Sequence, residues 1–431
     1  MTGADIPGMA RIATGGSSGA TAKNSAREAA AMTRLVGDLN PPTRLLCGTG
    51  PTNPDPRVLR ALAAPVLGQF DPAFTAIMQE VATLGREAFQ TSNPRTFAVS
   101  GTGRAGMEAA IASLVEPGDR VLVANCGRFG DLFVDLAGRY GARVAQVTAE
   151  WGRVIDPGAV GDALEREPAK VVAVVHGETS TGMLQPLEEI GRICRARHAL
   201  LVVDAVVTLG GVPVRVDDWG IDLCSAGTQK CLGCPSGMAP ITYNDQVERA
   251  ISARRTPVAT NYLDLSQLQR YWSPERLNHH TLPTSMTYAL REALRLVAEE
   301  GPHARFGRHH RAGAALKAGL TAMGLELFGD PEHRLPMITA ARIPAGVEDE
   351  AVRAQLLDEF GVEIATSFGP LRGRIWRIGL MGYNAELRAA LAVLAGLEHV
   401  LRSQGVDVPR GAGVEAARQA YHAGGDSPAG A

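Results

Sequence analysis

The stretch ALLVVDAVV at residues 199–207 decides the fold of this 431-residue chain. It is continuously apolar except for Asp204, and KVVAVVH at 170–176 has the same character. Strands of this kind are buried on both faces, as in parallel sheets that carry helices on each side. Short apolar runs alternate with amphipathic helical patterns across 95–244, so we predict an α/β fold with a mostly parallel seven-stranded sheet. Its strands are expected at 96–100, 120–125, 143–147, 170–176, 199–206, 223–226 and 238–243.

The rest of the chain divides around this sheet. Residues 1–36, rich in Gly, Ala, Ser and Thr, are expected to be a flexible leader, and 37–290 a large domain with an N-terminal arm. Beyond about residue 290, long helical patterns mix with strands expected at 337–343, 362–365 and 375–378. We therefore predict a smaller α+β domain over 291–408 and a tail over 409–431.

Composition limits the classes of partner. Lys and Arg number 43 against 45 Asp and Glu, and this balance gives no argument for nucleic acid or an anionic membrane. No apolar stretch approaches the roughly 20 residues of a membrane span, and no signal peptide is evident. Cysteines are sparse, and the single CxxC at Cys231 and Cys234 lacks the further ligands of a zinc site. We expect a soluble, cytoplasmic protein that binds small molecules and no metal.

Lys230 and Asp204 carry the strongest chemical signal. Lys230 follows an apolar strand within CSAGTQKCLGCPSG at 224–237, and burial there would lower its pKa and favour Schiff-base chemistry. Asp204 ends the strand of 199–207, at the edge where open α/β sheets bind ligands. A surface lysine and a turn-capping aspartate are the simpler explanations of each residue alone. Together they match a pyridoxal-phosphate site, where an acid holds the ring nitrogen protonated.

A Gly-rich turn, FAVSGTGRAGMEAAI at 97–111, joins a predicted strand to a predicted helix. Its backbone N–H groups suit a phosphate. It also reads GxGxxG from Gly101 to Gly106, so an NAD-dependent oxidoreductase is an alternative. That alternative requires an acidic residue at the end of the next strand, which instead ends in Asn125 and Cys126.

Four further residues each allow two interpretations. Phe129, at a strand-to-helix turn, either packs in the core or stacks on a cofactor ring. Arg377 interrupts the apolar strand of WRIGLMG, and it forms either a structural ion pair or a clamp on a substrate carboxylate. His279 and His280 are adjacent, which rarely suits chelation of one metal, so we expect a structural role for them.

Taken together, these segments resemble the class V, fold-type I aminotransferases, the group that includes the alanine-glyoxylate and serine-glyoxylate enzymes. The similarity runs from about residue 45 to 401. Its markers include LLCGTGPTNPDPRVL at 45–59, HGETSTGMLQPL at 176–187 and RLNHHTLPTSMTYALREAL at 276–294. Cysteine desulfurases of this fold need a cysteine in the C-terminal domain, whereas all six cysteines here precede Pro235. A non-catalytic regulator of this fold would carry a DNA-binding domain, for which neither terminus is long or basic enough.

The resemblance implies a role for each matching residue. Lys230 carries pyridoxal 5'-phosphate and moves the proton of the substrate, while Asp204 pairs with the ring nitrogen. A homodimer with shared active sites is implied as well. The other implied cofactor contacts are Phe129 and Val206 on the ring faces, Thr179 at the phenolic oxygen, and Thr102, Gly103, Arg104, Gln229 and the partner subunit's Thr281 at the phosphate.

Within this group the chain looks most like the (S)-ureidoglycine-glyoxylate aminotransferases of purine catabolism. It differs at Gly103, where serine is expected, and in a short segment at 254–261. Asn278 and Gln69 stand where alanine-glyoxylate relatives typically have Tyr and His, and two amides complement a ureido group. The resemblance implies transfer of an amino group from (S)-ureidoglycine to glyoxylate, with Arg377 holding each carboxylate. Alanine and serine are the alternative donors.

Overall fold

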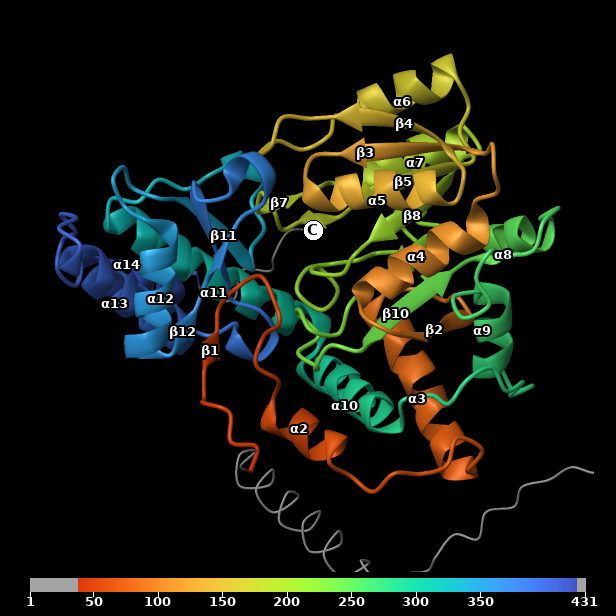
Figure 1. Ribbon diagram of the computed structural model, residues 1–431, viewed down its shortest axis with the longest axis horizontal. Helices are drawn as coiled ribbons and strands as arrows, with labels where there is room; N and C mark the ends of the chain where they lie inside the picture. The colour runs from red at the N-terminus through yellow and green to blue at the C-terminus, as the bar shows by residue number, and fades with distance from the viewer. Residues whose placement is uncertain (1–37, 425–431) are drawn as a thin grey trace, which may run out of the picture. The chain divides into compact units, whose positions relative to one another are not determined.

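The computed structural model describes residues 38–424, and Figure 1 shows how their helices and strands are arranged. The predicted leader at 1–36 and the last part of the predicted tail lie outside the described residues. Contacts along the chain divide it between Thr43 and Arg44. The elements below belong to the unit that begins at Arg44.

A seven-stranded sheet forms the centre of this unit, in the order β2-β10-β9-β8-β5-β3-β4. Only β10 runs antiparallel to its neighbours, so the prediction of a mostly parallel seven-stranded sheet is confirmed. The strands are β2 (Arg95–Ser100), β3 (Arg120–Asn125), β4 (Arg143–Thr148), β5 (Val171–Val175), β8 (Leu200–Asp204), β9 (Leu223–Ser225) and β10 (Met238–Tyr243).

The two apolar stretches that predicted the fold form its inner strands. Every residue of β5 and β8 is buried, and Val175 is the register partner of Asp204. Helices pack on this sheet, among them α4 and α5, which lie in front of it in Figure 1. The helices of this region are α2 (Pro56–Leu62), α3 (Pro72–Ala88), α4 (Gly103–Leu114), α5 (Arg128–Arg139), α6 (Pro157–Arg166), α7 (Glu188–Ala196), α8 (Asp245–Ser252), α9 (Leu265–Trp272) and α10 (Thr284–Glu300).

The C-terminal part has its own apolar core around Trp376, which is fully buried. A three-stranded antiparallel sheet lies there in the order β11-β14-β13, and helices cover it. Its elements are α11 (Pro302–Ala322), β11 (Ile338–Arg342), α12 (Asp349–Phe360), β12 (Val362–Glu363), β13 (Ala365–Thr366), β14 (Ile375–Gly379), α13 (Leu387–Ser403) and α14 (Ala412–Ala423). The domain boundaries at 290 and 408 remain a prediction.

The prediction of a single strand at 362–365 is wrong. The segment divides at Ile364, so that β12 pairs in parallel with β1 (Leu45–Leu46) while β13 pairs with β14. Each half therefore takes a different, distant partner. The remaining short elements are β6 (Gly177–Glu178), β7 (Met183–Leu184), η1 (Pro331–His333), η2 (Gly369–Leu371) and η3 (Gly382–Asn384). Among the described residues, no helix has the length and apolarity that a membrane crossing requires.

Candidate active site

A cavity of about 290 Å³ lies at the carboxyl edge of the parallel strands, where ligands bind in open α/β sheets. Another cavity, of about 390 Å³, is lined by other residues. The cavity at the carboxyl edge brings together most of the residues that the sequence singled out. Four apolar or small residues that the sequence reasoning missed complete its wall. The lining residues are Thr102, Gly103, Arg104, Met107, Phe129, Leu132, Gly177, Thr179, Asp204, Val206, Val207, Gln229 and Lys230.

Lys230 lies in the loop between β9 and β10 and reaches the cavity with its amine. The Nζ atom donates a hydrogen bond to the carbonyl oxygen of Thr49. A Cβ atom at Gly50 would lie only 2.5 Å from that Nζ, so the approach requires glycine. Burial, with the charge of Arg377, lowers the pKa of Lys230 to about 8. About a tenth of the amine is therefore neutral at pH 7 and about half at pH 8, and the neutral form is the nucleophile.

Asp204 is the last residue of β8 and forms part of the cavity wall. Its Oδ1 accepts a hydrogen bond from the backbone N–H of Val206 at 2.7 Å, the one hydrogen bond to this carboxylate within residues 38–424. Burial raises the pKa of Asp204 to about 7, against the opposing effects of that N–H and of Lys230. A cationic N–H group in the cavity would stabilise the carboxylate and lower this pKa again.

The Gly-rich turn brings the start of α4 to the cavity. Thr102 precedes the helix, and its side chain makes no capping hydrogen bond. A Cβ atom at Gly103 would lie 2.7 Å from Cγ2 of Val206, so the serine expected from relatives would not fit without moving Val206. The uncapped N–H groups and the helix dipole leave a site for an anion.

The cavity fits pyridoxal phosphate, the cofactor that the resemblance implies. Gln229 is part of the wall, and its Oε1 is buried without a hydrogen-bond partner among the described residues. A buried polar atom of this kind indicates a missing partner. An anion site, a carboxylate and an amine line the same cavity, together with the side chains of Phe129 and Val206. The anion site suits the phosphate, the carboxylate suits the pyridine nitrogen, and the amine suits the aldehyde. Phe129 and Val206 suit the flat ring.

Glu178 holds Phe129 in place, and sequence reasoning missed it. Its Oε2 accepts from the backbone N–H of Phe129 at 3.0 Å, and its Oε1 accepts from the N–H and hydroxyl of Ser180 at 3.0 and 2.6 Å. Burial raises the pKa of Glu178 despite these hydrogen bonds. The carboxyl group anchors the first turn of α5 and thus the ring of Phe129. The only signal in the sequence was an acid that closely follows the apolar run VVAVV at 171–175.

Arg377 lies behind the cavity wall. Its guanidinium donates to the carbonyl oxygen of Thr366, and to that of Thr179 at 3.1 Å. It also lies over the ring of Phe368, 4.6 Å from the centroid. No carboxylate within residues 38–424 is paired with it, so the structural ion pair considered above is not formed there. Burial lowers the pKa of Arg377 to about 10. Its role as a carboxylate clamp remains a prediction.

Gln69, Asn278 and Thr281 do not line the cavity of their own chain. Gln69 donates from Nε2 to Oδ1 of Asn278 at 3.1 Å, and Arg276 donates to the carbonyl oxygen of Gln69 at 2.7 Å. Thr281 is exposed. The structure therefore brings these three residues to one surface. Their predicted contacts with substrate and with a partner's cofactor remain predictions.

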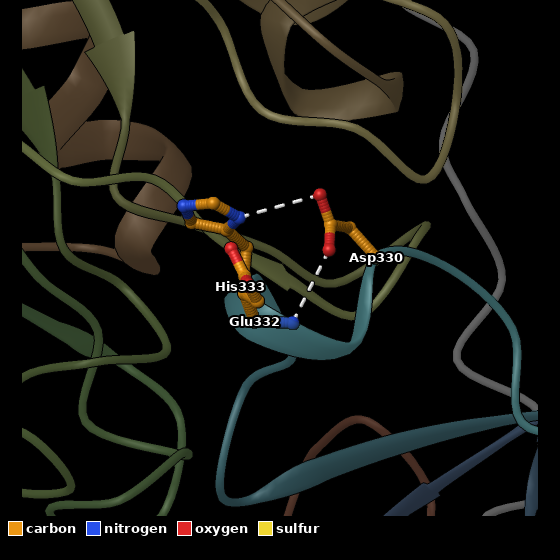
Figure 2. Close-up of side chains that lie close together, drawn as sticks. All are labelled: Asp330, Glu332 and His333. Atoms are coloured by element: carbon orange, nitrogen blue, oxygen red, sulfur yellow. Dashed lines mark hydrogen bonds and ion pairs between the residues drawn. The ribbon is translucent and has the colours of Figure 1, made fainter.

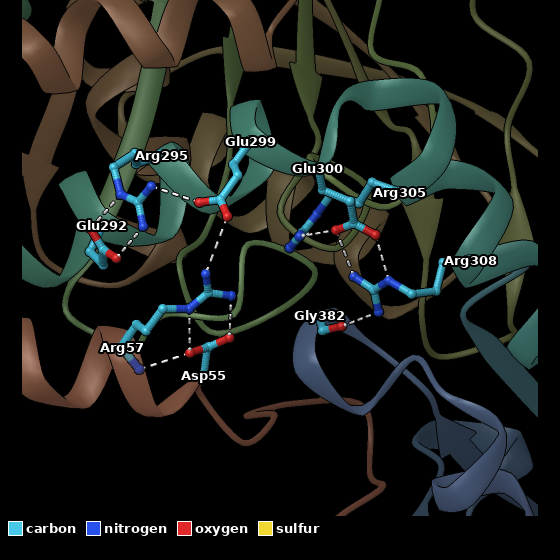
Figure 3. Close-up of polar contacts among 9 residues, drawn as sticks. All are labelled: Asp55, Arg57, Glu292, Arg295, Glu299, Glu300, Arg305, Arg308 and Gly382. Carbon is cyan, nitrogen blue, oxygen red and sulfur yellow. Dashed lines mark hydrogen bonds and ion pairs between the residues drawn. The ribbon is translucent and has the colours of Figure 1, made fainter.

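Figure 3 shows a group of ion pairs, and one of its arginines, Arg305, contacts the loop of Lys230. Arg305 donates to the carbonyl oxygens of Cys231 at 2.7 Å and of Gly210 at 2.9 Å. Arg308 donates to the carbonyl oxygen of Gly382 at 2.8 Å, and Glu300 accepts from both arginines. Gly382 follows β14, the strand of Arg377. One partly buried carboxylate thus joins the loop of Lys230 to the segment that follows the strand of Arg377.

Replacing Glu300 by glutamine should lower the free energy of unfolding by about 3 kcal/mol, because two largely buried arginines lose their counter-charge. The side chain of Arg305 is 6% exposed, and that of Glu300 is 25% exposed. Urea unfolding of the cofactor-free protein measures the change. Glu299→Gln is the matched control, since Glu299 is 52% exposed and, within residues 38–424, pairs only with Arg57 and Arg295. It should cost less than about 1 kcal/mol. Equal losses in the two variants would contradict the expected difference.

Asp330, Glu332 and His333, shown in Figure 2, form a small polar cluster with ligand atoms within 4.8 Å of one another. Asp330 caps η1 by accepting from the N–H of Glu332 at 3.2 Å, and it pairs with Arg153 at 3.0 Å. Its carboxylate is thus already engaged by a helix end and an arginine. We therefore interpret this cluster as the N-terminal cap of η1.

Comparisons with known proteins identify the family of this chain. A sequence model of the family described as aminotransferase class-V matches residues 59–396. The chain is 50% identical to the (S)-ureidoglycine–glyoxylate transaminase of Bacillus subtilis (strain 168), over 89% of this chain and 97% of that one. It is 40% identical to the alanine–glyoxylate aminotransferase of Mus musculus, over 84% and 89%. A crystal structure of ureidoglycine-glyoxylate aminotransferase from Bacillus subtilis superposes with a TM-score of 0.88 at 52% identity, covering 90% of this chain and all of that one.

Proposed function

We propose, since the chain belongs to the class-V aminotransferase family, that it transfers the amino group of (S)-ureidoglycine to glyoxylate. The products are N-carbamoyl-2-oxoglycine, also called oxalurate, and glycine. The chain is a pyridoxal-phosphate-dependent transaminase of fold-type I, and small amino and 2-oxo acids are its substrates. The family assignment excludes the NAD-dependent oxidoreductase as an alternative. The choice of donor depends above all on the amide pair of Gln69 and Asn278.

The amide pair is chemically suited to a ureido group. A ureido group carries N–H donors beside a carbonyl acceptor, and each carboxamide offers the complementary pair. The Oε1 atom of Gln69 is buried and has no partner within the described residues, while its Nε2 binds Asn278. Alanine would leave these polar groups without partners, and sites built to bind a polar group reject such analogues strongly.

The other residues have separable tasks in this proposal. When bound, pyridoxal phosphate withdraws electrons from the bonds at the substrate Cα. Lys230 takes the proton from Cα with its Nζ, whose pKa of about 8 lets it both accept and release protons near neutral pH. Asp204 holds the ring nitrogen in its protonated form. Arg377 holds the substrate carboxylate, while the Gly-rich turn and Gln229 hold the phosphate.

A homodimer with shared active sites is part of the same proposal. Four large apolar side chains lie exposed beside the amide pair, namely Val66 at 71%, Phe70 at 63%, Tyr262 at 47% and Leu277 at 42%. Exposed apolar side chains gathered in this way are typical of protein–protein interfaces. Burial of this surface by a second copy would direct Asn278, Gln69 and Thr281 toward the partner's cavity. A cytoplasmic location and a place in purine breakdown are proposed with it.

The double substitution Asn278→Tyr with Gln69→His tests the choice of donor. We expect kcat/KM for ureidoglycine to fall by at least ~100-fold and that for alanine to hold or rise, because the complement of the ureido group is lost. Steady-state assays with ureidoglycine, alanine and serine against glyoxylate give these values. Gln419→His, in α14, is a matched amide-to-imidazole control and should change neither of these kcat/KM values. A wild-type preference for alanine or serine over ureidoglycine would contradict the proposal.

A further inference from the structure

His279 and His280 form a continuous chain of hydrogen bonds that none of the roles above uses. Nε2 of His280 lies 2.6 Å from Oγ of Ser100, and Nδ1 of His280 lies 2.8 Å from Nδ1 of His279. Nε2 of His279 lies 2.9 Å from the carbonyl oxygen of Asn261. All four ring nitrogens are therefore engaged, which leaves none for a metal ion.

The position of each proton follows from the end of this chain. The carbonyl oxygen of Asn261 only accepts, so Nε2 of His279 carries a hydrogen. In the Nε2–H tautomer of His279, Nδ1 then accepts from Nδ1 of His280. Nε2 of His280 accepts in turn from the hydroxyl of Ser100. Burial lowers the pKa of His280 to about 4, which keeps that ring neutral as the chain requires.

Aromatic rings hold the His280 side chain on two sides. The ring of Tyr262 lies edge-on at 5.2 Å and that of Tyr271 at 5.4 Å, measured between centroids. The guanidinium of Arg276 lies over the ring of Tyr271, with its Cζ 5.1 Å from the ring centroid. The imidazole thus has packing partners as well as hydrogen-bond partners, and the two contributions can be separated by substitution.

This chain of hydrogen bonds runs from Ser100 through the two histidines to the carbonyl oxygen of Asn261, and it links two parts of the site. Ser100 is the last residue of β2 and directly precedes the Gly-rich turn that lines the cavity. The histidines lie between Asn278 and Thr281 in the sequence. The chain therefore ties the loop that carries the donor-selecting amide to the base of the anion-binding turn. Functional groups that select a ligand need neighbours that hold them within about 0.5 Å.

We propose that His279 and His280 are positioning residues, which hold Asn278 and Thr281 in the geometry that selects ureido-bearing amino donors. This rests on the proposed function, because it concerns how Asn278 is oriented for that substrate. The histidines touch neither substrate nor cofactor in this proposal. They act through the segment 278–281 to which they belong, which their hydrogen bonds tie to Ser100 and Asn261.

His280→Phe separates hydrogen bonding from packing, because phenylalanine keeps a ring between Tyr262 and Tyr271 but lacks both nitrogens. We expect the ratio of kcat/KM for ureidoglycine to that for alanine to fall by ~10-fold or more, with the thermal midpoint nearly unchanged. The dissociation constant of pyridoxal phosphate, measured by absorbance titration, should rise severalfold because Thr281 is displaced. His399→Phe in α13 is the matched control and should leave the donor ratio and the dissociation constant of pyridoxal phosphate unchanged. A donor ratio within twofold of wild type in His280→Phe would overturn the proposal.

Ser100→Ala provides a second test if His280→Phe does not fold. It removes only the hydroxyl at one end of the chain of hydrogen bonds, and we expect the donor ratio to fall by about threefold or more. An unchanged ratio would again overturn the positioning role. The wild-type donor preference is measured first. A preference for alanine there would refute the proposed function, whereas an unaltered ureidoglycine preference in the variants would refute only the role of the histidines.

Discussion

Lys230→Met should lower the rate of transamination by at least ~10⁴-fold, since removal of a nucleophile and proton carrier affects several steps together. Methionine has nearly the same length and fills the space beside Gly50, so no cavity arises. Reduction with borohydride should link pyridoxal phosphate covalently to wild-type protein at residue 230, which peptide mass spectrometry detects. The variant should bind the cofactor only reversibly.

Lys317→Met is the matched control for this experiment. Lys317 is a second lysine whose pKa burial lowers, here to about 7, and its Nζ donates to the carbonyl oxygens of Leu335 and Pro336 at 2.9 and 3.2 Å. It lies outside the candidate cavity, so its loss should leave kcat within about threefold of wild type. Covalent trapping of the cofactor at a residue other than 230 would contradict the assignment.

The pH dependence of cofactor attachment gives an independent check on Lys230. Only the neutral amine attacks an aldehyde, and burial lowers the pKa of Lys230 to about 8. The rate at which cofactor-free protein takes up pyridoxal phosphate should therefore rise from pH 6 and level off above pH 8. Stopped-flow absorbance measures this rate. A rise that continued to pH 10 would indicate an amine with the ordinary pKa of a solvated lysine.

Asp204→Asn should lower kcat by ~10³-fold, or about 4 kcal/mol of transition-state stabilisation, because an amide cannot hold the ring nitrogen protonated. The same change should stabilise the cofactor-free fold at pH 8. Burial raises the pKa of Asp204 from 3.8 to about 7, so the folded state is penalised increasingly as pH rises through that window. Asparagine removes that penalty. Steady-state kinetics and thermal unfolding at pH 5 and pH 8 measure the two effects.

Asp222→Asn is the control that separates these effects. Asp222 is also buried, but it precedes β9 at the opposite edge of the sheet and its Oδ2 accepts from the N–H of Leu201 at 2.8 Å. Its replacement should leave kcat within threefold of wild type. If Asp204→Asn retained more than a tenth of wild-type kcat, the pairing of Asp204 with the cofactor would be wrong.

The sequence by itself determined the central sheet and the two residues on which the chemistry depends. Nearly continuous apolar strands such as 170–176 and 199–206 are typical of parallel sheets that helices cover on both faces. In a parallel sheet all carboxyl ends meet at one edge, so strand direction alone places Asp204 and the loop of Lys230 together. Local chemistry and strand direction suffice for this step.

Only the tertiary structure decided the contacts between segments distant in the chain. It placed β10 antiparallel between β2 and β9, and it divided 362–365 between two sheets. It also placed Thr49 and Gly50 on Lys230, and Glu178 on the first turn of α5. The hydrogen bonds from Ser100 through His280 and His279 join residues about 180 positions apart. Such contacts depend on how packed elements meet, and neither periodicity nor residue type along the chain records that.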